Sequence, residues 1–299
     1  MGKPWPFRSV PAGRHRLPQA QAGAEALATL RDEVAAELVE RLAPVRIQPA
    51  NILELGGDER LLGRLTRQYP RARITAVTES GGSPGRSLGA RLRRRTTRRV
   101  VAPFTRLPVG DASVALVVSN LALLSTSDQP ALFTECRRVL RPDGAMMFSL
   151  LGPDSLGGLR AAWAEIDSHA QLPVFVDMHD VGDAMFHAGL RDPVMDVERA
   201  SRPVPDIVTL LQLLKAARAG PAPRPSRPGL MTPSALERLA QAYPEHDDSG
   251  RPVVTWEVVF GHAWGATTPH AGRGDAKEFH VPVGAIGRRS VQRGTSGLS

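Results

Sequence analysis

Residues 51–77 read NILELGGDERLLGRLTRQYPRARITAV and decide the expected fold. An apolar run ends in Gly56-Gly57, leucines then recur at helical spacing through 58–69, and a second apolar run follows at 73–77. A strand, a helix and another strand in this order are typical of a parallel βαβ unit. The segment therefore predicts the first crossover of an α/β sheet.

The alternation of apolar runs and amphipathic segments continues along the chain. Further strands are predicted at 100–102, 114–119, 145–151, 194–197 and 253–260, and further helices at 24–42, 129–140, 154–168, 178–188, 205–219 and 233–242. The sequence RPDG at 141–144 predicts a turn with Gly144 at positive φ. The chain is expected to form a doubly wound, mostly parallel α/β sheet, with a helical insert at about 203–250 before the last strand.

The charge is concentrated in one segment. The 299 residues are 42% hydrophobic and 23% charged, as in ordinary globular proteins, and the formal net charge is +8. Residues 86–106 contain eight arginines and no acid. One basic segment on a neutral remainder argues against a nucleic-acid-binding face. The arginine run at 91–99 is interpreted as a solvated helix and loop, or as a site that recognises an acidic carrier protein or RNA.

Several site classes are disfavoured by composition. Cys136 is the only cysteine, which excludes an intramolecular disulfide and a cysteine-based zinc site. Neither His179 nor His262 has a second ligand at helical spacing that completes a site, so no metal site is predicted. No apolar run is long enough to span a membrane and the N-terminus lacks the apolar core of a secretory signal, so a cytoplasmic protein is expected.

Ligands of an open parallel sheet bind beyond the carboxyl ends of its strands. Gly56 and Gly57 follow the first strand, where bare backbone can approach a ligand closely. The acidic residues after them would repel a pyrophosphate. A zwitterion that carries a sugar fits better, because backbone N–H groups can bind its carboxylate and an acid can bind its ammonium or ribose hydroxyls.

Several sequence blocks carry a family resemblance. The blocks are ELGG at 54–57, LPVGDAS at 107–113, LVVSNLAL at 116–123, RVLRPDG at 138–144, GPDSLGGLR at 152–160, FVDMHDVGD at 175–183 and WEVVFGHAW at 256–264. The first four resemble the S-adenosyl-L-methionine-dependent methyltransferases of the Rossmann-like class, in order and spacing. The last three narrow the resemblance to the malonyl-ACP (acyl carrier protein) O-methyltransferase family of biotin synthesis.

The resemblance implies a cofactor, S-adenosyl-L-methionine, and residues that would hold it. Glu54, Gly56 and Gly57 would cradle the cofactor, Glu79 is the nearest acid for its ribose, and Asn120 would lie beside its sulfonium. The implied reaction is methyl transfer to the free carboxylate of a malonyl thioester, with malonyl-ACP or another acidic carrier as partner.

The resemblance also implies an arginine that orients the acceptor carboxylate through two hydrogen bonds. Arg160 is the candidate for that catalytic role, together with Asn120. The family likeness divides the chain into a flexible basic N-terminus at 1–23, a Rossmann-like cofactor-binding part at 24–152, a helical cover with the last strands of the same domain at 153–264, and a loose tail at 265–299.

The chain departs from the family pattern around the cofactor. The departures are Asp58 and Arg60 at glycine positions, Thr78 where the ribose acid is expected, Pro103 where an acid near the adenine is expected, and Leu124-Ser125 in place of an aromatic-polar pair. The cofactor motif is therefore degenerate. Two alternatives stay open: a catalytically inactive methyltransferase-fold protein that acts as an interaction or assembly factor, and a protein-modifying enzyme similar to a respiratory-complex assembly factor that hydroxylates an arginine.

Overall fold

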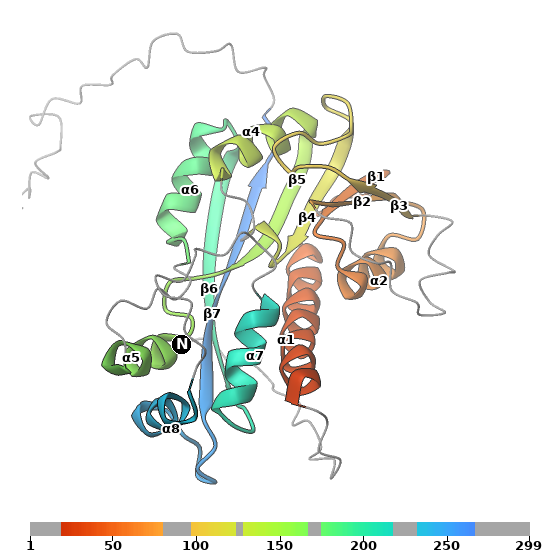
Figure 1. Ribbon diagram of the computed structural model, residues 1–299. Helices are drawn as coiled ribbons and strands as arrows, with labels where there is room; N and C mark the ends of the chain where they lie inside the picture. The colour runs from red at the N-terminus through yellow and green to blue at the C-terminus, as the bar shows by residue number, and fades with distance from the viewer. Residues whose placement is uncertain (1–18, 80–96, 124–127, 167–174, 218–231, 267–299) are drawn as a thin grey trace, which may run out of the picture. The chain divides into compact units, whose positions relative to one another are not determined.

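Seven strands form one sheet in the order β3-β2-β1-β4-β5-β7-β6 (Figure 1). The strands are β1 (Asn51–Leu55), β2 (Arg73–Thr78), β3 (Thr97–Val101), β4 (Val114–Asn120), β5 (Leu140–Leu151), β6 (Arg191–Pro203) and β7 (Val253–Trp264). The first five strands are parallel, and β7 is antiparallel to both β5 and β6. The predicted doubly wound, mostly parallel sheet is confirmed.

The structure is a computed structural model that describes residues 19–79, 97–123, 128–166, 175–217 and 232–266. By their contacts, Met1–Thr268 form one unit and Pro269–Ser299 a second, which lies outside the described residues. None of the helices in the described ranges is both long enough and apolar enough to cross a membrane.

Helices cover both faces of the sheet. One face carries α1 (Gln19–Leu42), α2 (Glu59–Gln68), α5 (Gly157–Ile166), α7 (Ile207–Ala217) and α8 (Pro233–Ala242); the other carries α4 (Gln129–Val139) and α6 (Met178–His187). Helices α1 and α7 lie side by side (Figure 1). Along β1, Ile52 packs with the first set, while Leu53 and Leu55 pack with the second. Successive side chains of a strand point to opposite faces of the sheet. A parallel strand between two helical layers is therefore apolar on both faces.

Salt bridges attach α1 to the far edge of the sheet. Arg41 pairs with Glu198 of β6, and Arg202 of β6 pairs with Glu33. The Arg41 guanidinium also lies 4.2 Å from the centre of the Phe260 ring. Helix α1 is therefore held along its C-terminal half by charges as well as by its apolar face.

Two strands differ from their predicted bounds. The strand expected at 100–102 is β3, Thr97–Val101, which includes Arg98 and Arg99. The interpretation of these two arginines as helix or loop is wrong, because an edge strand accepts exposed charges. Strand β6 is 13 residues long where only 194–197 was expected. Seven of its 13 residues are exposed and only Ala200 is buried, so no long apolar run marks it.

The turn expected at 141–144 is wrong. These residues lie within β5, where the pairing with β4 shifts register between Val114 and Leu116. Gly144 is not among the described glycines with positive φ. A glycine fits this position because space is limited. A Cβ at Gly144 would lie 3.0 Å from the carbonyl oxygen of Val114.

Two helix starts also differ. Helix α1 begins at Gln19, so the flexible N-terminus does not extend to residue 23. Residues 19–23 are Gln, Ala and Gly, and the alanines and glutamines favour a helix without any apolar periodicity. Helix α5 begins at Gly157 instead of 154, because the preceding residues form a turn that is bound to β7. Residues 1–18, 80–96 and 267–299, with most of the arginine segment and the predicted tail, lie outside the described residues.

The close approach of β7 to β5 gives a stability prediction. A Cβ at Gly261 would overlap the Phe148 ring, whereas a Cβ at Gly110 would meet nothing within 4 Å. Gly261→Ala should therefore lower the free energy of unfolding by about 1–3 kcal/mol, measured by urea denaturation. Gly110→Ala is the matched control and should unfold at the wild-type midpoint. Equal midpoints for the two variants would contradict the packing described for β5 and β7.

Candidate active site

The strand order reverses between β1 and β4. From β1 the chain continues to β2 on one side, and from β4 it continues to β5 on the other. In an open parallel sheet the crevice at the carboxyl ends of such a pair is the usual ligand site. The loops that follow the two strands touch here, since a Cβ at Gly56 would lie 2.5 Å from the Cβ of Ala122.

Glu54 shapes the loop after β1. Its side chain is fully buried. Its Oε2 accepts a hydrogen bond of 2.9 Å from Gly57 N, and its Oε1 accepts one of 3.0 Å from Asp58 N. Burial raises the pKa of Glu54 to about 8, although the two backbone N–H groups act to lower it. Glu54 therefore acts on the loop and not directly on the open crevice.

The loop requires both of its glycines. Gly56 has φ +122° and Gly57 has φ +70°, conformations that side-chain-bearing residues rarely adopt. Space is also lacking, because a Cβ at Gly57 would lie 2.6 Å from Cγ2 of Thr78. The predicted close turn of bare backbone is therefore present at the carboxyl end of β1.

Asp58 caps α2. Its Oδ1 accepts hydrogen bonds from Arg60 N at 2.8 Å and Leu61 N at 3.2 Å. Together with the two N–H groups bound by Glu54, four backbone donors of the loop bind carboxylates of the chain itself. The expectation that the loop backbone binds a ligand's carboxylate is therefore not met at these four donors.

Asn120 joins four elements at the carboxyl end of β4. Its side chain is 2% exposed. The Nδ2 group donates to Asp58 Oδ2 and to the carbonyl oxygen of Arg31 in α1, both at 2.9 Å. Its Oδ1 accepts from Ser149 Oγ of β5 at 3.0 Å. The next residue, Leu121, has φ +53°, so the chain turns sharply after β4.

Glu79 lies at the same edge of the sheet. It follows β2 directly and is exposed. Its Oε1 accepts a hydrogen bond of 3.2 Å from Phe104 N, in the loop after β3. The carboxylate is therefore bound on the β3 side of the edge, next to Pro103.

Arg160 lies at the carboxyl end of β5. Its Nη1 and Nη2 donate to the carbonyl oxygen of Pro153 at 3.2 Å, and Nη2 also donates to that of Ser155 at 3.0 Å. Both carbonyls belong to the turn between β5 and α5. The structure thus places Glu54, Gly56, Gly57, Glu79, Asn120 and Arg160 at the carboxyl ends of neighbouring strands.

Sequence reasoning missed three participants. Asp58 is the hydrogen-bond partner of Asn120, and Ser149 is the other. Glu257 of β7 accepts from the N–H of Asp154 in the turn that holds Arg160. Ser149 lies in the apolar run 145–151 and Glu257 is the only acid of 253–264, and buried polar groups require partners. That pattern was the available signal.

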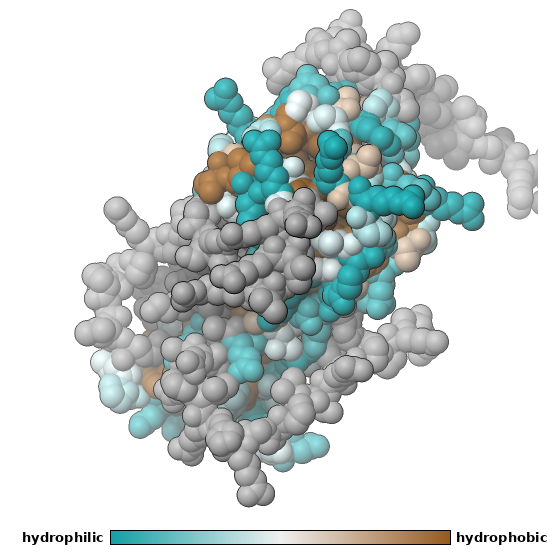
Figure 2. Space-filling model, turned by 90° about the vertical axis from the view of Figure 1, so that its right-hand side faces the viewer, coloured by the Kyte–Doolittle hydropathy of each residue, from teal (hydrophilic) through white to brown (hydrophobic). Residues whose placement is uncertain are grey.

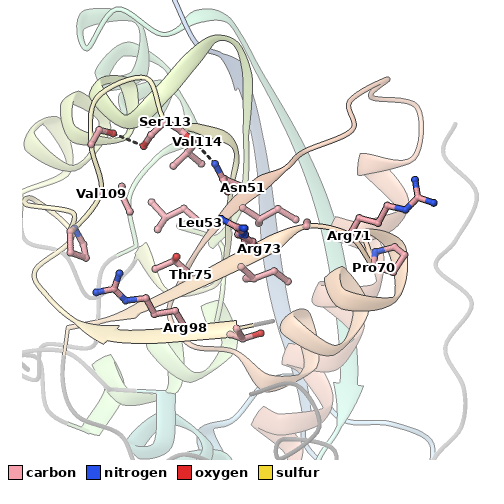
Figure 3. A pocket seen from close by; sticks show the side chains of 16 residues that line it. Asn51, Leu53, Pro70, Arg71, Arg73, Thr75, Arg98, Val109, Ser113 and Val114 are labelled. Atoms are coloured by element: carbon pink, nitrogen blue, oxygen red, sulfur yellow. Dashed lines mark hydrogen bonds between the residues drawn. The ribbon is translucent and has the colours of Figure 1, made fainter. Parts of the chain in front are cut away.

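A cavity of about 940 Å³ lies at the opposite end of the strands, near their amino ends. Its lining includes residues near the amino ends of β1 to β4, and Asn51 Nδ2 donates to Ser113 O within it at 3.1 Å (Figure 3). The described lining contains Arg71, Arg73 and Arg98 and no acid, and Arg71 and Arg98 extend to opposite sides in Figure 3. The cavity is therefore separate from the crevice at Gly56 and Asn120.

The surface near β3 and α2 is mixed in character. Figure 2 shows hydrophilic side chains projecting around smaller hydrophobic patches on this side. Val101 at the end of β3 is 61% exposed.

In the described ranges, no three His, Cys, Asp or Glu side chains are grouped so that they could hold a metal ion.

The raised pKa of Glu54 predicts a pH dependence of stability. Between its ordinary value of 4.5 and about 8, the folded chain binds a proton that the unfolded chain releases. The contribution of Glu54 to the free energy of unfolding is therefore greatest at low pH and is lost as the pH rises through about 8. Urea denaturation should show this fall in the wild type, and Glu54→Gln, which does not titrate, should reduce it. A variant with the same pH profile as the wild type would contradict the assignment.

Comparisons with known proteins agree with this geometry. Residues 54–148 match the family described as "Methyltransferase domain". The YcgJ protein of Bacillus subtilis has the same fold, with a TM-score of 0.54 at 10% identity over 79% of this chain and 99% of that one.

Closer relatives are malonyl-ACP O-methyltransferases. The one from Halorhodospira halophila is 40% identical over 272 residues, which cover 88% of this chain and 90% of the relative. The one from Laribacter hongkongensis is 38% identical over 280 residues, which cover 89% and 94%. On this similarity over most of both chains, the protein belongs to the malonyl-ACP O-methyltransferase family.

Proposed function

We propose that the protein transfers a methyl group from S-adenosyl-L-methionine to the free carboxylate of a malonyl thioester on an acyl carrier protein. The relatives named for this activity support the substrate. The observation that carries the proposal is that three parts of the candidate site lie at the same end of the sheet. The glycine loop, Asn120 and Arg160 lie at the carboxyl ends of β1, β4 and β5, so a cofactor and an acceptor can meet there.

The residues at this edge fit the cofactor. Gly56 and Gly57 provide a turn without side chains, and Glu54 holds that turn in place. Glu79 offers a carboxylate for the cofactor's ribose hydroxyls. When bound, S-adenosyl-L-methionine supplies a methyl group that leaves the sulfonium sulfur for a carboxylate oxygen, which yields a methyl ester.

Arg160 would bind the acceptor carboxylate. The turn carbonyls use three of its five guanidinium N–H groups, and the Nε–H and one Nη1–H remain, so a carboxylate oxygen can accept a hydrogen bond from either of these two. In the described part of the chain Arg160 forms no ion pair, and a substrate carboxylate would meet an uncompensated positive charge. Methyl transfer to a carboxylate requires alignment and removal of water, and no general base is needed.

A second candidate function is that of an interaction or assembly factor with little or no cofactor binding. The specific observation in its favour is Asp58. Its carboxylate occupies the N–H groups of Arg60 and Leu61 and is itself bound to Asn120. A glycine at this position would leave those donors free for a ligand. The cofactor motif is degenerate in this sense.

Calorimetric titration with S-adenosyl-L-methionine and S-adenosylhomocysteine separates the two candidates. The methyltransferase function predicts heat of binding and a thermal shift for the wild type. Gly57→Val should abolish both while the circular dichroism spectrum is retained, because its Cβ would displace the loop from Thr78. Gly110→Ala, which adds a methyl group in open space, is the control and should bind like the wild type.

Two results would contradict this account. Absence of heat and of a thermal shift at millimolar ligand would favour the assembly-factor candidate. Unchanged affinity in Gly57→Val would show that the loop after β1 does not hold the cofactor.

A further inference from the structure

The turn between β5 and α5 is held by β7. Gly152 N donates to Glu257 O at 2.8 Å, and Leu156 N donates to Thr255 O at 2.9 Å. Ser155 Oγ donates to Glu257 O and accepts from Glu257 N, both at 3.0 Å. The turn is thus bound to β7 at three points of its backbone and side chains.

The carboxylate of Glu257 adds a fourth point. Glu257 is the only acid in β7 and is 8% exposed. Its Oε2 accepts from Asp154 N at 2.7 Å. Gly152 makes room for it, because a Cβ there would lie 2.7 Å from Cδ of Glu257. The absence of a side chain at Gly152 therefore leaves the space that the buried Glu257 carboxylate occupies.

The turn also contains a strained residue. Leu156 has φ +63°, a left-handed conformation that is strained for a non-glycine residue. Such a conformation persists only where the surrounding contacts hold it. The bonds to Thr255 and Glu257 are those contacts.

The carbonyl groups of this turn determine where Arg160 lies. Its guanidinium binds the carbonyl oxygens of Pro153 and Ser155, the residues on either side of Asp154. The N–H of Asp154 is the group that Glu257 binds. The carboxylate on β7 and the guanidinium on α5 therefore bind the N–H and the carbonyl oxygen of one peptide unit, Pro153–Asp154, from opposite directions.

We propose that Glu257 is a positioning residue for methyl transfer, because its carboxylate fixes the turn whose carbonyl oxygens hold Arg160 toward the acceptor carboxylate. The inference rests on the proposed function, since it assigns the acceptor to Arg160. Glu257 itself touches neither cofactor nor acceptor.

The test compares Glu257→Ala, Glu257→Gln and Glu198→Ala in the full chain, with malonyl-coenzyme A as the malonyl thioester. In Glu257→Ala the KM for the thioester should rise about tenfold or more, as expected for a misplaced charged hydrogen bond. The dissociation constant of S-adenosylhomocysteine should stay unchanged. Glu257→Gln retains an acceptor for Asp154 N and should restore much of the lost affinity. Glu198→Ala removes an ion pair of β6 with Arg41 and should lower thermal stability without raising the KM.

Hydrogen exchange provides a readout that does not depend on activity. Amides of residues 152–160 should exchange faster in Glu257→Ala than in the wild type or in Glu198→Ala. An active wild type whose KM is unchanged in Glu257→Ala, with only a loss of thermal stability, would overturn the inference and leave the proposed function intact. A wild type that neither binds nor methylates the thioester would overturn both.

Discussion

The amide of Asn120 is the interaction on which the carboxyl edge of the sheet depends. It is buried, and it binds the cap of α2, a carbonyl of α1 and the hydroxyl of Ser149 in β5. A buried amide with all of its partners in place admits one arrangement of its neighbours. The same helix is held against β6 by the ion pairs of Glu33 and Arg41, and Arg41 also contacts the Phe260 ring. The edge is thus defined by a few polar contacts between elements far apart in the sequence.

Two carboxylates at this edge bind the chain's own backbone. Glu54 is buried and holds the glycine loop, and Asp58 caps the following helix. The first arrangement keeps a bare turn in place, which favours a closely bound cofactor. The second occupies donors that a ligand anion would otherwise use. The same edge therefore carries the bare turn and the Asp58 cap, which bear in opposite directions on the proposed cofactor binding.

The fold could be predicted from the sequence because apolar runs of strand length alternate with helical spacing from residue 51 to residue 151. Strand β6 was largely missed, since an edge strand with alternating exposure has no apolar run. The positions of Glu54, Gly56, Gly57 and Asn120 followed from the ends of predicted strands. Their partners did not, because Asn120 and Arg31 are 89 residues apart, and Asp154 and Glu257 are 103 apart. Local patterns carry no information on such pairs.

In the proposed function the crevice between β1 and β4, and not the arginine-lined cavity, binds the cofactor. Hydrogen exchange with and without S-adenosylhomocysteine tests it most directly, because it locates the bound ligand along the chain. The account predicts slower exchange at residues 55–61 and 119–123, and no change at 70–75 and 108–114. Protection of the cavity segments with no change at the glycine loop would contradict it.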